Sequence, residues 1–189
     1  MRMTPWCALA LVAVAGCSGK SASVAPTPER ATADGAGGER ATADQAAAAK
    51  QSTDLLEEGV VSAARQAIGK PYLYGGTGKG EAGFDCSGLI QYAYAQQGIS
   101  LPRVSTAQAT AGREVEKSLA ALARGDILTF ASQPGGSKVN HVGLYLGQGR
   151  FIHSSSSRGV MESTLSGTDP NGQWWFVRWV GARRVIEVQ

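Results

Sequence analysis

The chain has 189 residues, which is enough for one domain of ordinary size plus attached segments. Its 18 basic and 15 acidic residues leave a formal charge of +3, and no basic stripe with interleaved aromatic residues is present, so we expect no nucleic acid partner. The three cysteines, Cys7, Cys17 and Cys86, show no metal-ligand spacing such as C-x-x-C. We therefore expect no structural zinc and no cofactor.

The first 16 residues have the features of a secretory signal. Arg2 supplies a positive charge, and the apolar stretch from Trp6 to Ala15 is too short to span a bilayer. The segment Val14-Ala15-Gly16-Cys17 resembles a bacterial lipobox, in which the peptidase cuts before the cysteine and the cysteine carries the lipid. We expect residues 1–16 to be removed and Cys17 to be acylated. A plain signal peptide cut near Ala15 is the alternative.

Residues 17–53 are rich in Ala, Gly, Ser and Thr and nearly lack large apolar side chains. Such a segment cannot bury a core of its own. We expect a lipidated cysteine followed by a flexible tether with a root-mean-square reach of about 35 Å.

The folded domain is expected over residues 54–189. Asp54 can cap a helix, and Leu56, Val60, Ala64 and Ile68 then recur at every fourth position on one face. The glycine-rich loop 75–80 lacks the spacing of a phosphate-binding loop, so we do not expect a nucleotide site there.

Cys86 begins the next predicted helix and is the only cysteine beyond position 17. Asp85 is a natural N-cap, which places Cys86 in the first turn, where the helix dipole favours a thiolate. We expect the pKa of this thiol to be lowered, as it is in reactive cysteines with a histidine partner. A buried, inert cysteine is the alternative.

The chain has two histidines, His141 and His153. Alternation over residues 139–146 predicts a strand, and residues 147–149 predict a three-residue hairpin turn. If Leu146 pairs with Arg150, both imidazoles lie on one face, diagonal to each other. A two-residue loop would place them on opposite faces.

These residues suggest a nucleophile, a base and an orienting group. His141 would take the proton of Cys86, and His153 would bond the other ring nitrogen of His141. Trp174, Trp175, Phe176 and Trp179 are interpreted as core and rim of a last strand over 175–185 rather than as a platform for sugars.

Six motifs in this order resemble the NlpC-type family of bacterial cell-wall cysteine endopeptidases, within the papain-like superfamily. The resemblance covers roughly residues 55–186. The motifs are Pro71–Gly76, Phe84–Leu89, Leu101–Arg103, Gly125–Ile127, His141–Tyr145 and Phe151–His153.

The resemblance implies an α+β fold, in which a central antiparallel sheet packs against helices and the nucleophile starts a helix. It implies hydrolysis of amide bonds in peptidoglycan stem peptides, commonly the D-glutamyl–diaminopimelyl bond, with Cys86, His141 and His153 as the catalytic set. Tyr72 matches the active-site tyrosine, but the loop 78–83 is longer than usual, so Tyr74 remains an alternative.

The resemblance leaves the substrate-binding residues open. Asp85 and Ser87 are candidates for binding substrate, although Asp85 can serve as a cap alone. Arg103 can meet a substrate carboxylate or simply lie on the surface.

Two other functions remain open: a thiol amidase or acyltransferase acting on wall or lipid substrates, and a non-catalytic wall-binding lipoprotein. We expect a monomer whose partners are stem peptides and, through Cys17, a membrane. Because Ser18 rather than an acidic residue follows Cys17, resemblance to lipoprotein sorting signals implies the outer membrane of a two-membrane host, with the domain facing the periplasm.

Overall fold

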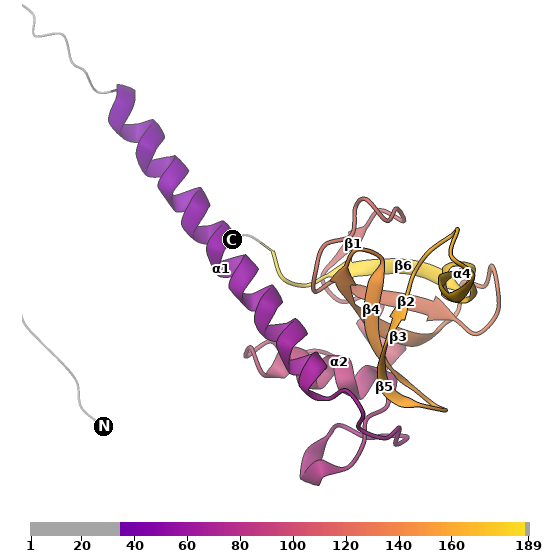
Figure 1. The fold of residues 1–189 in the computed structure, drawn as a ribbon. Coiled ribbons are helices and arrows are strands. Elements are labelled where there is room, and N and C mark those ends of the chain that lie inside the picture. Colours follow the sequence, from indigo (N-terminus) through magenta and orange to yellow (C-terminus); the bar gives the residue numbers. More distant parts are fainter. Residues whose placement is uncertain (1–34, 188–189) are drawn as a thin grey trace, which may run out of the picture.

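The computed structural model describes residues 35–187, and their longest element is α1 (Gly35–Gln66). Figure 1 shows the N-terminal half of α1 extending away from the rest of the fold. The helix therefore includes residues 35–53, where we expected a flexible tether. The predicted signal peptide, Cys17 and the tether up to residue 34 lie outside the described residues.

Local helix propensity favours a helix in part of the segment that we expected to be a tether. The run Ala46–Ala49 consists of the best helix former and lies N-terminal to residue 54. Asp54 does not cap the helix, because it lies in the helix interior and pairs with Lys50 one turn earlier at 2.7 Å. The prediction that a helix starts at Asp54 is therefore wrong, although the helix does pass through this segment.

The C-terminal half of α1 packs against α2 (Cys86–Ala95), and the two helices lie side by side in Figure 1. Val60, Val61 and Ala64 are fully buried there. Ile68, which we placed in the same stripe, follows the end of the helix and is 49% exposed. None of the helices in residues 35–187 has the length and apolarity needed to cross a membrane.

A six-stranded sheet in the order β1-β6-β2-β3-β4-β5 forms the centre, and every neighbouring pair is antiparallel. Its strands are β1 (Arg113–Val115), β2 (Ile127–Ala131), β3 (Val139–Gly147), β4 (Arg150–Ser155), β5 (Gly159–Thr164) and β6 (Trp179–Arg184). Short helices complete the fold: η1 (Lys79–Glu81), α3 (Ser105–Gln108) and α4 (Pro170–Phe176).

Both faces of the sheet are covered. Val142, Leu144 and Ile152 point into one cluster with α1 and α2, while Tyr145 and Phe151 belong to a second cluster. This division follows the alternation that the sequence predicts for β3. Successive side chains of a strand point to opposite faces, so the central strands β2, β3 and β4 contribute to both clusters.

The β3–β4 hairpin has the register that we predicted, but a different turn. Leu144 pairs with Ile152 and Tyr145 with Phe151, as expected. The loop contains two residues, Gln148 and Gly149, both at positive φ, and the register shifts between Tyr145 and Gly147. This bulge adds the residue that the shorter loop lacks, so both histidines still share a face.

The last strand is shorter than predicted. It begins at Trp179, because Trp174 and Trp175 belong to α4. The side chain of Asp169 caps α4 and Pro170 occupies its first turn, which is a common start for a helix.

Candidate active site

The carboxylate of Asp85 holds the first turn of α2 in place. One oxygen accepts the N–H of Gly88 at 2.7 Å, and the other accepts the N–H of Gly75 at 2.9 Å. Arg103 binds the same carboxylate in a bidentate manner, at 2.9 and 2.6 Å. Burial favours the protonated acid, but these hydrogen bonds outweigh it and keep the pKa of Asp85 below its ordinary value. Asp85 therefore acts as an ionised cap beside the thiol.

Hydrogen bonds to its backbone hold the segment just before Cys86 in place. The N–H of Phe84 donates to the carbonyl of Pro71 at 3.0 Å, and the hydroxyl of Ser154 donates to the carbonyl of Phe84 at 2.7 Å. A side chain at Gly83 would collide with the Pro71 carbonyl. Only glycine allows this close approach of the two backbone segments before Cys86.

The two imidazoles are directly linked. Nε2 of His141 lies 3.0 Å from Nδ1 of His153, and the rings meet edge to face. This bond occupies Nε2 of His141 and leaves Nδ1 as the ring nitrogen available to the Cys86 thiol. The predicted convergence of the two histidines is thus present in the structure.

Aromatic rings enclose this pair. Trp175 of α4 stacks on His141 with ring centroids 5.3 Å apart and presents its edge to His153 at 4.7 Å. Phe151 stacks on His153 at 5.1 Å. His153 is only 1% exposed. His153 therefore lies in a water-poor environment, in which its electrostatic interactions are strengthened.

Burial governs the protonation of the resting site. It raises the pKa of Cys86, and hydrogen bonding with the backbone of Val142 offsets this only in part. It lowers the pKa of His141 to about 4 and that of His153 to about 3. We expected a lowered thiol pKa, but desolvation of the sulfur outweighs the N–H groups of the helix start. At neutral pH the resting site holds a thiol and two neutral imidazoles.

Two cavities meet at Cys86, with volumes of about 720 and 530 Å³. Tyr72, Cys86 and Asn140 line both of them. His141, His153 and the tryptophans of α4 line the larger cavity, whereas Asp85, Ser87 and Arg103 line the smaller. The thiol thus lies where a bound chain could extend to either side of the reacting bond.

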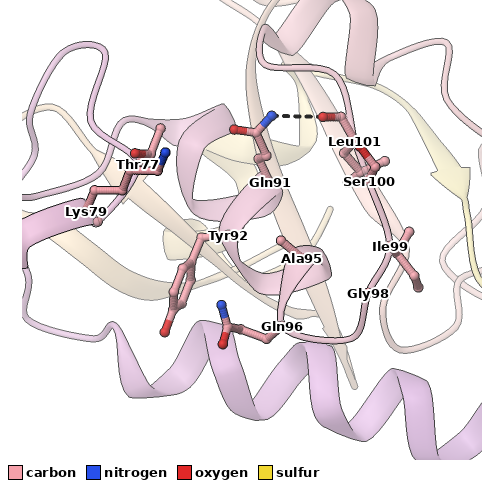
Figure 2. A pocket seen from close by; sticks show the side chains of 11 residues that line it. Thr77, Lys79, Gln91, Tyr92, Ala95, Gln96, Gly98, Ile99, Ser100 and Leu101 are labelled. Atoms are coloured by element: carbon pink, nitrogen blue, oxygen red, sulfur yellow. Dashed lines mark hydrogen bonds between the residues drawn. The ribbon is translucent and has the colours of Figure 1, made fainter.

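A third pocket of about 560 Å³ lies on α2 away from the thiol. Figure 2 shows its side chains, among them Gln91, Tyr92 and Leu101, with the amide of Gln91 bonded to the Leu101 carbonyl. It contains neither Cys86 nor a histidine. Among the described residues, no three His, Cys, Asp or Glu side chains gather as a metal site would require.

The structure brings most of the predicted site residues together. Tyr72 lines both cavities beside Cys86, whereas the side chain of Tyr74 is 89% exposed at the rim of the smaller one. This geometry favours Tyr72 as the active-site tyrosine. Arg103 lines the smaller cavity, where its guanidinium is paired with the Asp85 carboxylate at 2.6 Å.

Sequence reasoning missed two residues beside the histidines. Trp175 was assigned to a strand, although the signature Asp169-Pro170 of a helix start could have corrected this. Ser163 bonds Nε2 of His153 at 2.9 Å, and no local motif marks it. Both contacts depend on elements that follow the last motif in the chain.

Comparisons with known proteins match this arrangement. A probable endopeptidase of Mycobacterium tuberculosis is 45% identical over 97 residues, which are 51% of this chain and 23% of that protein. The bifunctional muramidase/DL-endopeptidase CwlT of Bacillus subtilis is 38% identical over 125 residues, 66% of this chain and 35% of that protein. The chain therefore spans only a quarter to a third of the length of these relatives.

The structure of the peptidoglycan hydrolase RipB from Mycobacterium tuberculosis superposes with a TM-score of 0.56 at 31% identity, covering 71% of this chain and 67% of that one. This similarity confirms the α+β fold expected from the motifs. The model of the NlpC/P60 family matches residues 69–184, which include Cys86, His141 and His153. The chain belongs to the NlpC/P60 family.

Proposed function

We propose that the domain is a cysteine peptidase that hydrolyses amide bonds in peptidoglycan stem peptides, at the D-glutamyl–diaminopimelyl linkage. The observation that carries the proposal is the linked His141–His153 pair in the same cavity as the Cys86 thiol. The names of CwlT, a DL-endopeptidase, and of RipB, a peptidoglycan hydrolase, support this bond type and this polymer.

In this mechanism Nδ1 of His141 takes the thiol proton, and the sulfur of Cys86 attacks the amide carbonyl. The resulting oxyanion would lie near the N–H groups at the start of α2, including that of Cys86. Burial and then the neighbouring Cys86 raise the pKa of Tyr72. Its phenol therefore keeps its proton and can donate a hydrogen bond in the cleft. The imidazolium of His141 gives its proton to the leaving amine, and water then hydrolyses the thioester.

Digestion of purified sacculi, with the fragments identified by mass spectrometry, tests this proposal. The wild type should release fragments that end in D-glutamate and fragments that begin with diaminopimelate. Cys86→Ala should release neither while keeping the wild-type circular dichroism spectrum. Undiminished digestion by Cys86→Ala, or transfer of the acyl group to an added amine in place of water, would contradict the hydrolase assignment.

We also propose that Cys17 is acylated, with palmitate among its chains, and anchors the domain to the periplasmic face of an outer membrane. The apolar run before Cys17 and the small residues Ala15 and Gly16 support this. The wild type should stay with membranes in high salt, and Cys17→Ser should not. Soluble wild-type protein with an unmodified N-terminus would contradict the anchor.

A further inference from the structure

Ser163 on β5 contacts His153, the member of the histidine pair that is bonded to His141. Its hydroxyl oxygen lies 2.9 Å from Nε2 of His153, while Nδ1 of His153 lies 3.0 Å from His141. In the β4–β5 ladder Phe151 pairs with Ser163 and His153 pairs with Met161. His153 and Ser163 are thus diagonal neighbours on one face, the spacing at which side chains of adjacent strands meet.

The protonation of His153 decides whether His141 can act as a base. A neutral imidazole carries one proton, so His153 exists either as the Nε2–H or as the Nδ1–H tautomer. If Nδ1 of His153 carries the proton, it donates to Nε2 of His141. The proton of a neutral His141 must then be on Nδ1, the remaining ring nitrogen, which can no longer accept the proton of Cys86.

The Nε2–H tautomer has the opposite effect. Its free Nδ1 accepts the N–H of Nε2 on His141, which leaves Nδ1 of His141 unprotonated and able to accept the proton of Cys86. It is also the only tautomer that accommodates an imidazolium at His141, because two N–H groups would otherwise face each other at 3.0 Å. In this tautomer Nε2–H of His153 requires an acceptor, and the hydroxyl oxygen of Ser163 is within hydrogen-bond distance.

We propose that Ser163 is a positioning residue for the Cys86–His141 pair: its hydroxyl oxygen accepts Nε2–H of His153 and thereby holds His153 in the tautomer that makes His141 a base. The proposal deepens the proposed function and rests on it for the catalytic readout. Ser163 itself touches neither the substrate cavities nor the thiol.

The surroundings of His153 make this hydrogen bond important. The aromatic rings of Phe151 and Trp175 contact its imidazole, and they offer no alternative acceptor for Nε2–H. His153 is 1% exposed, so water cannot freely replace a lost partner. An N–H that is buried without an acceptor is strongly disfavoured, so loss of the Ser163 hydroxyl would favour the other tautomer.

Three substitutions at one position separate the hydroxyl from its volume. Ser163→Thr keeps a hydroxyl, Ser163→Val has the same shape as threonine without the hydroxyl, and Ser163→Ala removes the hydroxyl with little change of volume. We expect Ser163→Val and Ser163→Ala to lower kcat on a soluble stem peptide about tenfold, as the loss of about 1.4 kcal/mol from the transition state would. KM should stay unchanged, and Ser163→Thr should restore kcat.

Two readouts do not depend on substrate turnover. Nitrogen-15 NMR of the full chain should show Nε2 of His153 protonated in the wild type and in Ser163→Thr, and a shift toward Nδ1–H in Ser163→Val. The rate of Cys86 alkylation by iodoacetamide, followed by peptide mass spectrometry, should fall in Ser163→Val and Ser163→Ala by about the same factor as kcat, and Ser163→Thr should keep the wild-type rate.

Wild-type kcat together with the wild-type tautomer in Ser163→Val would overturn the proposal. An equal loss in Ser163→Thr and Ser163→Val would also overturn it, because the hydroxyl would then not be the determining group. A wild type that cleaves no stem peptide but shows the tautomer and alkylation pattern above would contradict the proposed function alone.

Discussion

The ion pair between Asp85 and Arg103 should be the polar contact that matters most for the stability of the site. Replacing Asp85 with Ala removes the acceptor for the N–H groups of Gly75 and Gly88. It also removes the acceptor for the two terminal nitrogens of the Arg103 guanidinium. Loss of the cap costs about 1 kcal/mol. Loss of the charged hydrogen bonds adds about 1.5–3 kcal/mol, toward the lower end here because the Arg103 side chain is 34% exposed.

The free energy of unfolding should therefore fall by about 3 kcal/mol in Asp85→Ala. For a domain of this size such a loss lowers Tm by about 6–12 °C. Asp85→Asn keeps a carbonyl oxygen for the Gly88 N–H and loses the charge, so its destabilisation should be about half as large. Urea unfolding followed by tryptophan fluorescence measures both values.

A double-mutant cycle with Arg103→Leu isolates the pair. We expect a coupling energy of about 1–2 kcal/mol between Asp85 and Arg103. The exposed pair of Lys50 and Asp54, with side chains 70% and 56% exposed, is the matched control and should couple by no more than about 0.5 kcal/mol. Additivity of Asp85→Ala and Arg103→Leu to within about 0.5 kcal/mol would refute the reasoning.

Three further predictions concern the histidines and the loop before the thiol. His153→Gln and His153→Asn should keep part of the activity on sacculi, because an amide can bond His141, whereas His153→Ala should lose more; equal rates in all three would assign His153 a purely structural role. Burial lowers the pKa of His141 to about 4 and of His153 to about 3 from 6.5, so below pH 6.5 the unfolded chain binds more protons at these histidines than the folded chain does. Their contribution to the free energy of unfolding should be fully present above pH 6.5 and be lost progressively down to about pH 3 in urea titrations. If the double variant His141→Gln/His153→Gln loses as much stability over this range, the histidines are not the cause. Gly83→Ala should cost about 1–3 kcal/mol because its methyl group meets the Pro71 carbonyl, while Gly181→Ala, whose nearest neighbour is 4.0 Å away, should be close to neutral by the same measurement.

The parts of the site that the sequence predicted are local in the chain. Asp85 next to Cys86 predicts a capped helix start, and alternation over residues 139–146 predicts which side chains of β3 share a face. Both patterns depend on neighbours within a few residues, so the sequence is sufficient for them. The helix propensity of the Ala-rich segment in α1 is also a local property. We nevertheless expected a tether there, because this segment has no apolar face to bury.

The remaining features depend on pairings between distant segments. The bulge at Leu146 keeps the histidines on one face despite a two-residue loop, because both faces of the sheet are buried and a slipped register would expose them. Ser163 reaches His153 only because β5 pairs with β4, and Trp175 reaches His141 only because α4 packs beside them. The sequence alone predicted Cys86 as the candidate nucleophile, the convergence of the two imidazoles and the family. The tertiary structure decided what surrounds them, since burial and cross-strand contacts arise only when distant segments pack together.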